Sequence, residues 1–160
     1  MRKVIVNSTP LISLCKVGLL DLLKKQYGEI TIPEAVFQEV SRKNDIVREQ
    51  ISSSDWIHIE KIRETKSRRM YKAKLHDGEV EVMILAQEHE GEHLVIIDDG
   101  PARKTADYLG LTLTGTIGVL IKAKINGHID AVMPVIKEME RNGIYISNDL
   151  KARVKRISKE

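Results

Sequence analysis

The sequence has only one cysteine, Cys15, and no long apolar run. One thiol cannot form an internal disulfide or supply the set of thiolates that a structural zinc site needs. A membrane-spanning helix requires roughly 18 consecutive apolar residues, and no segment approaches that length. The glycine fingerprints of phosphate loops and dinucleotide sites are also missing. These absences argue against a disulfide-stapled, thiolate–zinc, membrane-spanning or nucleotide-loop protein.

The histidines and the amino-terminal segment add two further exclusions. His89 and His93 are four residues apart, but Gly91 interrupts the helix that would place them on one face as metal ligands. The first residues run directly into a strand-like segment, without the apolar region and cleavage site of a secretory signal. Together with the single cysteine, this predicts a cytoplasmic protein without a membrane partner.

Charge and hydrophobicity are balanced along the chain. Hydrophobic residues make up 42% and charged residues 31% of the sequence, which is typical of a globular rather than a disordered protein. No linker, internal repeat or low-complexity segment divides it, so a single domain over residues 1–160 is expected. The formal net charge of +3 permits a nucleic-acid partner without requiring one.

Short apolar runs alternate with helical patterns. We expect strands at residues 3–6, 29–32, 56–60, 94–97, 111–115 and 144–147. We expect helices at residues 11–23 with a break at Gly18, and at 33–40, 76–90, 102–109, 117–125, 131–141 and 148–159, while residues 41–54 are weakly helical. Strands that alternate with helices predict an α/β layered fold with a mainly parallel sheet.

Polar residues stand where the strands end. After the first, fourth and fifth strands these are Asn7, Asp98 with Asp99, and Thr114. Right-handed crossovers bring the carboxyl ends of parallel strands to one edge of the sheet, where ligands bind in open α/β folds. Glu39 and Glu79 lie on helices near that edge. A carboxylate cluster without thiols suits Mg²⁺ or Mn²⁺, which activate water and neutralise a phosphodiester.

These residues belong to motifs that resemble those of PIN-domain ribonucleases, and more closely a branch of small prokaryotic proteins described only as nucleic-acid-binding. The matching segments are VIVNSTPLI (4–12), IPEAVFQEV (32–40), DGEVE (77–81), IDD (97–99) with Arg103 and Ala106, and GLTLTGTIG (110–118). Each segment is short, but together they follow the family's order. The resemblance implies a PIN-like three-layer α/β/α sandwich, bound Mg²⁺ or Mn²⁺, and hydrolysis of single-stranded RNA.

Carried over by position, the resemblance implies catalytic acids at Glu39, Glu79 and Asp98 or Asp99. The same acids would hold the metal together with Asn7, which stands where the family usually has its first acid. An amide oxygen coordinates a cation without adding charge, so weaker metal binding and lower activity are expected. Of the two aspartates, we expect Asp99 to face the metal and the other to cap the next helix.

Basic and hydroxyl side chains near this edge are candidates for contact with RNA. The predicted contacts are Arg68, Arg69, Lys72, Arg103, Thr114 and Thr116. The basic run at 61–74 has a second interpretation, as a solvated loop or an edge that binds an antitoxin. Arg103 could instead form a structural ion pair with Asp99, about one helical turn away. The resemblance further implies a homodimer, and often the toxin role in a toxin–antitoxin pair.

Other functions stay open at this stage. Glu79 could simply stabilise a helix N-terminus, and Glu39 could simply be solvated. A catalytically impaired PIN-like protein would bind RNA or a partner protein without cleaving, with Asn7 marking the altered site. A phosphoacceptor domain shares the acidic sheet edge, but it needs an acidic pair after the first strand, which Asn7 and Ser8 do not provide. The sequence favours a metal-dependent endoribonuclease.

Overall fold

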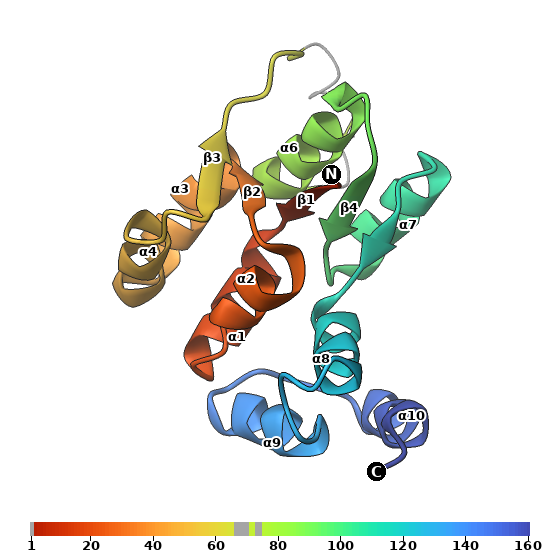
Figure 1. Ribbon diagram of the computed structural model, residues 1–160. Helices are drawn as coiled ribbons and strands as arrows, with labels where there is room; N and C mark the ends of the chain where they lie inside the picture. The colour runs from red at the N-terminus through yellow and green to blue at the C-terminus, as the bar shows by residue number, and fades with distance from the viewer. Residues whose placement is uncertain (1, 66–70, 73–74) are drawn as a thin grey trace.

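The central feature of the computed structural model, which describes residues 2–65, 71–72 and 75–160, is a five-stranded sheet. All neighbouring strands are parallel, in the order β3-β2-β1-β4-β5 (Figure 1). The strands are β1 (Lys3–Val6), β2 (Ile30–Pro33), β3 (Ile57–Glu60), β4 (His93–Ile96) and β5 (Leu113–Thr114). The predicted α/β fold with a mainly parallel central sheet is confirmed.

The central strand β1 and its neighbour β4 end at the same level. Val6 lies opposite Ile96, and the backbone N–H of Asn7 donates to the carbonyl of Ile96 at 3.0 Å. Both strands are almost entirely apolar and buried, because helices cover both faces of the sheet. The residues that follow them, Asn7 and Ile97, therefore leave the sheet side by side.

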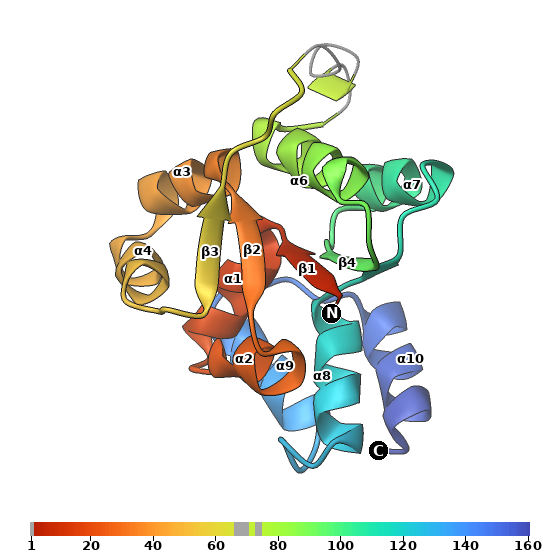
Figure 2. The same ribbon diagram turned by 45° about the horizontal axis from the view of Figure 1, so that its top comes forward.

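Helices surround this sheet in two groups. Helix α6 packs on β1, β2 and β4 and against α3, whereas α8, α9 and α10 gather at the other end of the molecule, as Figure 2 shows. None of the helices among the described residues is long and apolar enough to cross a membrane. The helices are α1 (Ser8–Lys16), α2 (Asp21–Tyr27), α3 (Glu34–Lys43), α4 (Asp45–Ser52), α6 (Asp77–Glu88), α7 (Gly100–Tyr108), α8 (Thr116–Ile125), α9 (Met133–Arg141) and α10 (Asn148–Ser158).

Helix α6 is buried on all sides over most of its length, from Gly78 to Ala86. It therefore carries Glu79 and Glu81 into the interior, where each is only 5% exposed. The Glu81 carboxylate accepts a hydrogen bond from the backbone N–H of Ala35 at 3.0 Å. That N–H is one of the donors that the start of α3 cannot satisfy within the helix. This buried contact fixes α3 relative to α6.

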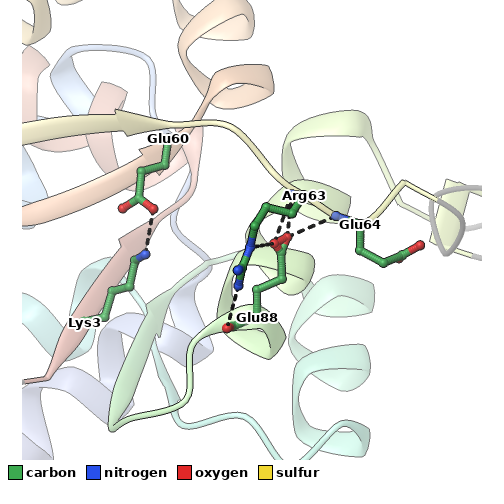
Figure 3. A network of polar contacts seen from close by, with 5 residues as sticks. All are labelled: Lys3, Glu60, Arg63, Glu64 and Glu88. Atoms are coloured by element: carbon green, nitrogen blue, oxygen red, sulfur yellow. Dashed lines mark hydrogen bonds and ion pairs between the residues drawn. The ribbon is translucent and has the colours of Figure 1, made fainter.

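Polar contacts join β1 to β3, and the connection after β3 to the end of α6 (Figure 3). Lys3 Nζ lies 2.8 Å from Glu60 Oε1. The Glu88 carboxylate accepts from the backbone N–H groups of Arg63, at 2.7 Å, and Glu64, at 3.3 Å. The Arg63 guanidinium donates in return to the Glu88 carbonyl at 3.2 Å. The connection that follows β3 is thus anchored at the end of α6 opposite to Glu79.

Several element boundaries differ from the prediction. The expected break at Gly18 is confirmed, since its φ of 72° turns the chain between α1 and α2. The weakly helical stretch 41–54 contains the end of α3 and the whole of α4. Asn44 separates them and caps α4 through its side chain. The predicted strand 111–115 is shorter in the structure, where β5 comprises only Leu113–Thr114.

The predicted strand at residues 144–147 is wrong. Gly143, with φ of 83°, ends the turn after α9, and the Ser147 side chain caps α10 by accepting from the Leu150 N–H at 3.2 Å. The four residues link two helices, and their apolar alternation reflects the packing of Ile146 against the core. The predicted helix at 131–141 begins slightly later, at Met133, with a proline in its first turn.

Candidate functional site

A cleft of about 500 Å³ opens where β1 and β4 end, between α3 and the start of α6. Four of the five residues predicted to hold a metal line it: Asn7, Glu39, Glu79 and Asp99. They come from four elements that lie far apart in the sequence. The fifth, Asp98, lines other pockets instead.

Asn7 contributes a buried oxygen without a partner. The residue is 3% exposed, and Oδ1 accepts no hydrogen bond from any described residue. A buried carbonyl oxygen left unpaired costs about 1–3 kcal/mol. The neighbouring backbone is close, because a Cβ placed at Gly78 would lie 3.6 Å from Asn7 Oδ1 and 3.0 Å from Glu39 Oε2. Gly78 thus makes room for both oxygens, and Asn7 Oδ1 is suited to a cation.

Two donors orient the Glu39 carboxylate. The buried hydroxyl of Ser8 donates to Oε2 at 3.0 Å, and Lys43 Nζ lies 2.8 Å from Oε1. The side chain of Glu39 is 20% exposed, whereas that of Lys43 is 59% exposed. Glu39 is therefore held at the cleft by specific contacts rather than left free in solvent.

Glu79 and Asp99 bring two carboxyl groups into contact. The backbone N–H of His76 donates to Glu79 Oε1 at 2.9 Å, closing the first turn of α6. Burial raises the pKa of the Glu79 carboxyl above its usual value. The His76 N–H lowers that pKa, and the negative charge and hydrogen bond of Asp99 raise it again. A proton or a cation shared by the pair relieves this repulsion.

The consecutive aspartates turn in different directions. Asp99 Oδ2 accepts from the Ala102 N–H at 3.0 Å, so this residue caps α7 while also facing Glu79. Asp98 accepts from the Thr116 N–H at 2.8 Å and from its hydroxyl at 2.6 Å. Both aspartates are therefore helix caps, and only Asp99 lines the cleft with Glu79.

Three of the residues predicted to bind RNA lie on the Asp98 side. The Arg103 Nη1 donates to the carbonyl of Ile97 at 2.9 Å, and the guanidinium lies near Asp98 rather than pairing with Asp99. The Thr116 hydroxyl donates its hydrogen bond to Asp98. Thr114 Oγ1 lies close to Gly118, where an added Cβ would clash with it. Asp98, Arg103 and Thr114 line a separate pocket of about 360 Å³ against α10.

The basic run before α6 is only partly described. Lys72 Nζ pairs with Asp77 Oδ1 at 3.0 Å, and Asp77 lies at the cleft. The charge of Lys72 is thus balanced by Asp77, a residue that lines the cleft. Arg68 and Arg69 lie outside the described residues.

Sequence reasoning missed two cations that line the cleft, Arg42 and Lys43. They follow Glu39 by three and four residues, a spacing that places them next to it on one helix face. That spacing was the available signal. Sequence reasoning also missed the role of Gly78, because the sequence does not show which side chains lie close to this glycine.

The donors fit a hard divalent cation. No group of three or more His, Cys, Asp or Glu side chains close enough to hold a metal occurs among the described residues. The convergent set instead combines the Glu79–Asp99 pair with the unpartnered amide oxygen of Asn7. Oxygen donors of this kind suit Mg²⁺ or Mn²⁺ rather than zinc. Because the repelling carboxyl pair and the unpaired oxygen both gain from a cation, the residues present fit the metal.

Comparison with known proteins places the chain in a family. The sequence profile of a family described as a PIN domain matches residues 3–160. A search of curated proteins gave no match. The family match spans every strand of the sheet and all four residues that line the cleft. The chain belongs to the PIN-domain family.

Proposed function

We propose that the protein is a metal-dependent endoribonuclease that hydrolyses phosphodiester bonds of single-stranded RNA. The PIN-domain family generally includes nucleases, and its members typically use divalent metals. The observation that carries the proposal is the contact between the Glu79 and Asp99 carboxyls, beside the unpaired oxygen of Asn7. A bound cation would relieve the repulsion within the carboxyl pair and give the Asn7 oxygen a partner.

Glu39, Glu79, Asp99 and Asn7, which line one cleft, would hold the Mg²⁺ or Mn²⁺ ion. The bound ion would supply the activation of a water molecule and the neutralisation of phosphodiester charge. The chain contributes position, since the His76 N–H holds Glu79 and the Ala102 N–H holds Asp99. Carboxylates fixed in advance need no reorganisation when charge develops.

Metal titration tests this proposal directly. Calorimetry with Mn²⁺ should detect binding by the wild type and none by the double variant Glu79→Gln with Asp99→Asn. Asp98→Asn is the matched control, because it removes a neighbouring charge outside the cleft and should retain binding. A labelled single-stranded RNA should be cleaved only by the proteins that bind Mn²⁺. Absence of binding at millimolar Mn²⁺ by the wild type would refute the proposal.

A second candidate is a PIN-domain protein that binds RNA or a partner protein without cleaving. Asn7 favours it, because an amide replaces one charge of the ligand set. Asn7→Asp separates the two candidates. A working nuclease should gain metal affinity and cleavage rate, whereas a binding protein should gain neither.

A further inference from the structure

The cleft is lined by basic as well as acidic side chains. Arg42 and Lys43, from the last turn of α3, line the same cavity as Asn7, Glu79 and Asp99. Both cationic side chains are exposed to solvent. A metal ion held by the carboxylates would therefore share the cavity with two cationic side chains. This charge distribution suits an anion that also contacts the metal.

The two cations differ in what they already bind. Lys43 Nζ is paired with Glu39 Oε1 at 2.8 Å. Arg42 pairs with no carboxylate in the part of the chain that the structure describes. A guanidinium presents several donors in a fixed fork that matches phosphate oxygens. Arg42 is therefore available for an incoming phosphate, whereas Lys43 is occupied.

We propose that Arg42 and Lys43 bind the phosphodiester backbone of the single strand that enters the cleft, and that Lys43 becomes available only when a divalent cation replaces it at Glu39. The inference rests on the proposed function in taking a nucleic-acid strand as the ligand. It goes further in assigning the contacts and in linking strand binding to metal binding.

The geometry of Glu39 carries the exchange. Each carboxylate oxygen already accepts one donor, from Ser8 and from Lys43. Ser8 is buried and fixed at the start of α1, whereas the Lys43 side chain is 59% exposed and can swing away. An exposed ion pair four residues apart on a helix is weak, so a divalent ion nearby displaces the ammonium. The released Lys43 then stays at the cleft, one residue from Arg42.

Binding of a short, fluorescently labelled RNA tests both parts by anisotropy. Phosphorothioate linkages prevent cleavage, and each protein is measured in EDTA and in Mn²⁺. Arg42→Gln should weaken binding about five- to tenfold in both buffers, and it should reduce the slope of log affinity against log salt by about 0.7. Arg48→Gln is the matched control, since Arg48 is an exposed arginine of α4 that does not line the cleft.

Lys43→Gln should weaken RNA binding in Mn²⁺ but leave it unchanged in EDTA. Calorimetry should also show about twofold tighter Mn²⁺ binding by this variant, because a competing cation is gone. Equal losses for Arg42→Gln and Arg48→Gln would overturn the phosphate contact. An equal loss for Lys43→Gln in both buffers would overturn the exchange.

The result also separates this inference from the proposed function. If RNA binding depends on Arg42 but ordinary RNA is not cleaved in Mn²⁺, the proposed nuclease activity is refuted and the contact of Arg42 with the phosphate is supported. Cleavage that is unaffected by Arg42→Gln and Lys43→Gln would support the nuclease and overturn the proposed phosphate contacts. No measurable binding of the single strand by the wild type would overturn the inference.

Discussion

Gly78 allows a prediction whose magnitude follows from the packing around it. A Cβ at this position would lie 3.0 Å from Glu39 Oε2 and 3.2 Å from Val36 Cγ2. Alanine normally stabilises a helix by about 0.5–1 kcal/mol relative to glycine. Here Val36 is fully buried and Glu39 is held by Ser8, so neither neighbour yields easily. Overpacking of this kind costs about 1–3 kcal/mol.

Gly78→Ala should therefore lower the free energy of unfolding by about 1–2 kcal/mol, because overpacking outweighs the helix preference. It should also weaken Mn²⁺ binding, since Glu39 must move. Gly100→Ala is the control: Gly100 starts α7, and a Cβ there would contact no atom within 4 Å. Urea unfolding and calorimetry measure both quantities. A Gly78→Ala protein as stable as Gly100→Ala, with unchanged Mn²⁺ affinity, would refute the reasoning.

Three further predictions address residues outside the metal ligands. Asp98→Ala should lower the free energy of unfolding by about 1–2 kcal/mol through loss of its contacts to Thr116, while Mn²⁺ affinity stays unchanged. Glu81→Gln should cost about 1–2 kcal/mol in urea unfolding, because a neutral amide is a weaker acceptor for the Ala35 N–H. Burial alone would raise the pKa of Glu160, but the Val132 and Met133 N–H groups and Lys124 lower it to about 2. Its stabilisation should thus be present above pH 4.5, the ordinary value, and be lost as the pH falls toward 2. Screening by the solvent near this chain end limits the stabilisation to about 1 kcal/mol, and Glu160→Gln should remove this pH dependence.

The sheet and the cleft residues were accessible from the sequence for a simple reason. Buried parallel strands are apolar throughout, and their ends share an edge by topology alone. Asn7 and Asp99 were therefore expected at one edge of the sheet, and the pairing of β1 with β4 brings them to one cleft. The position of Glu79 in the first turn of its helix placed it near that edge, and the resemblance to PIN domains selected it as a ligand.

The direction of individual side chains could not be predicted. Asp99 was favoured over Asp98 as the ligand and does line the cleft, but the sequence did not show that Asp99 also caps α7 or that Asp98 turns to the start of α8. Periodicity also misled at residues 144–147, where Ile144 and Ile146 alternate as in a half-buried strand. Their burial comes from helices on either side, which a local pattern does not reveal.

The opposed directions of Asp98 and Asp99 have a mechanical consequence. The side chains of these two consecutive residues bind the starts of both α7 and α8. A tilt of one helix relative to the other would strain one of these two hydrogen bonds. Helix α10 packs on α8, so the C-terminal helices are connected to the acid in the cleft through two consecutive residues. The two neighbouring aspartates after β4 thus couple the position of the cleft to that of the C-terminal helices.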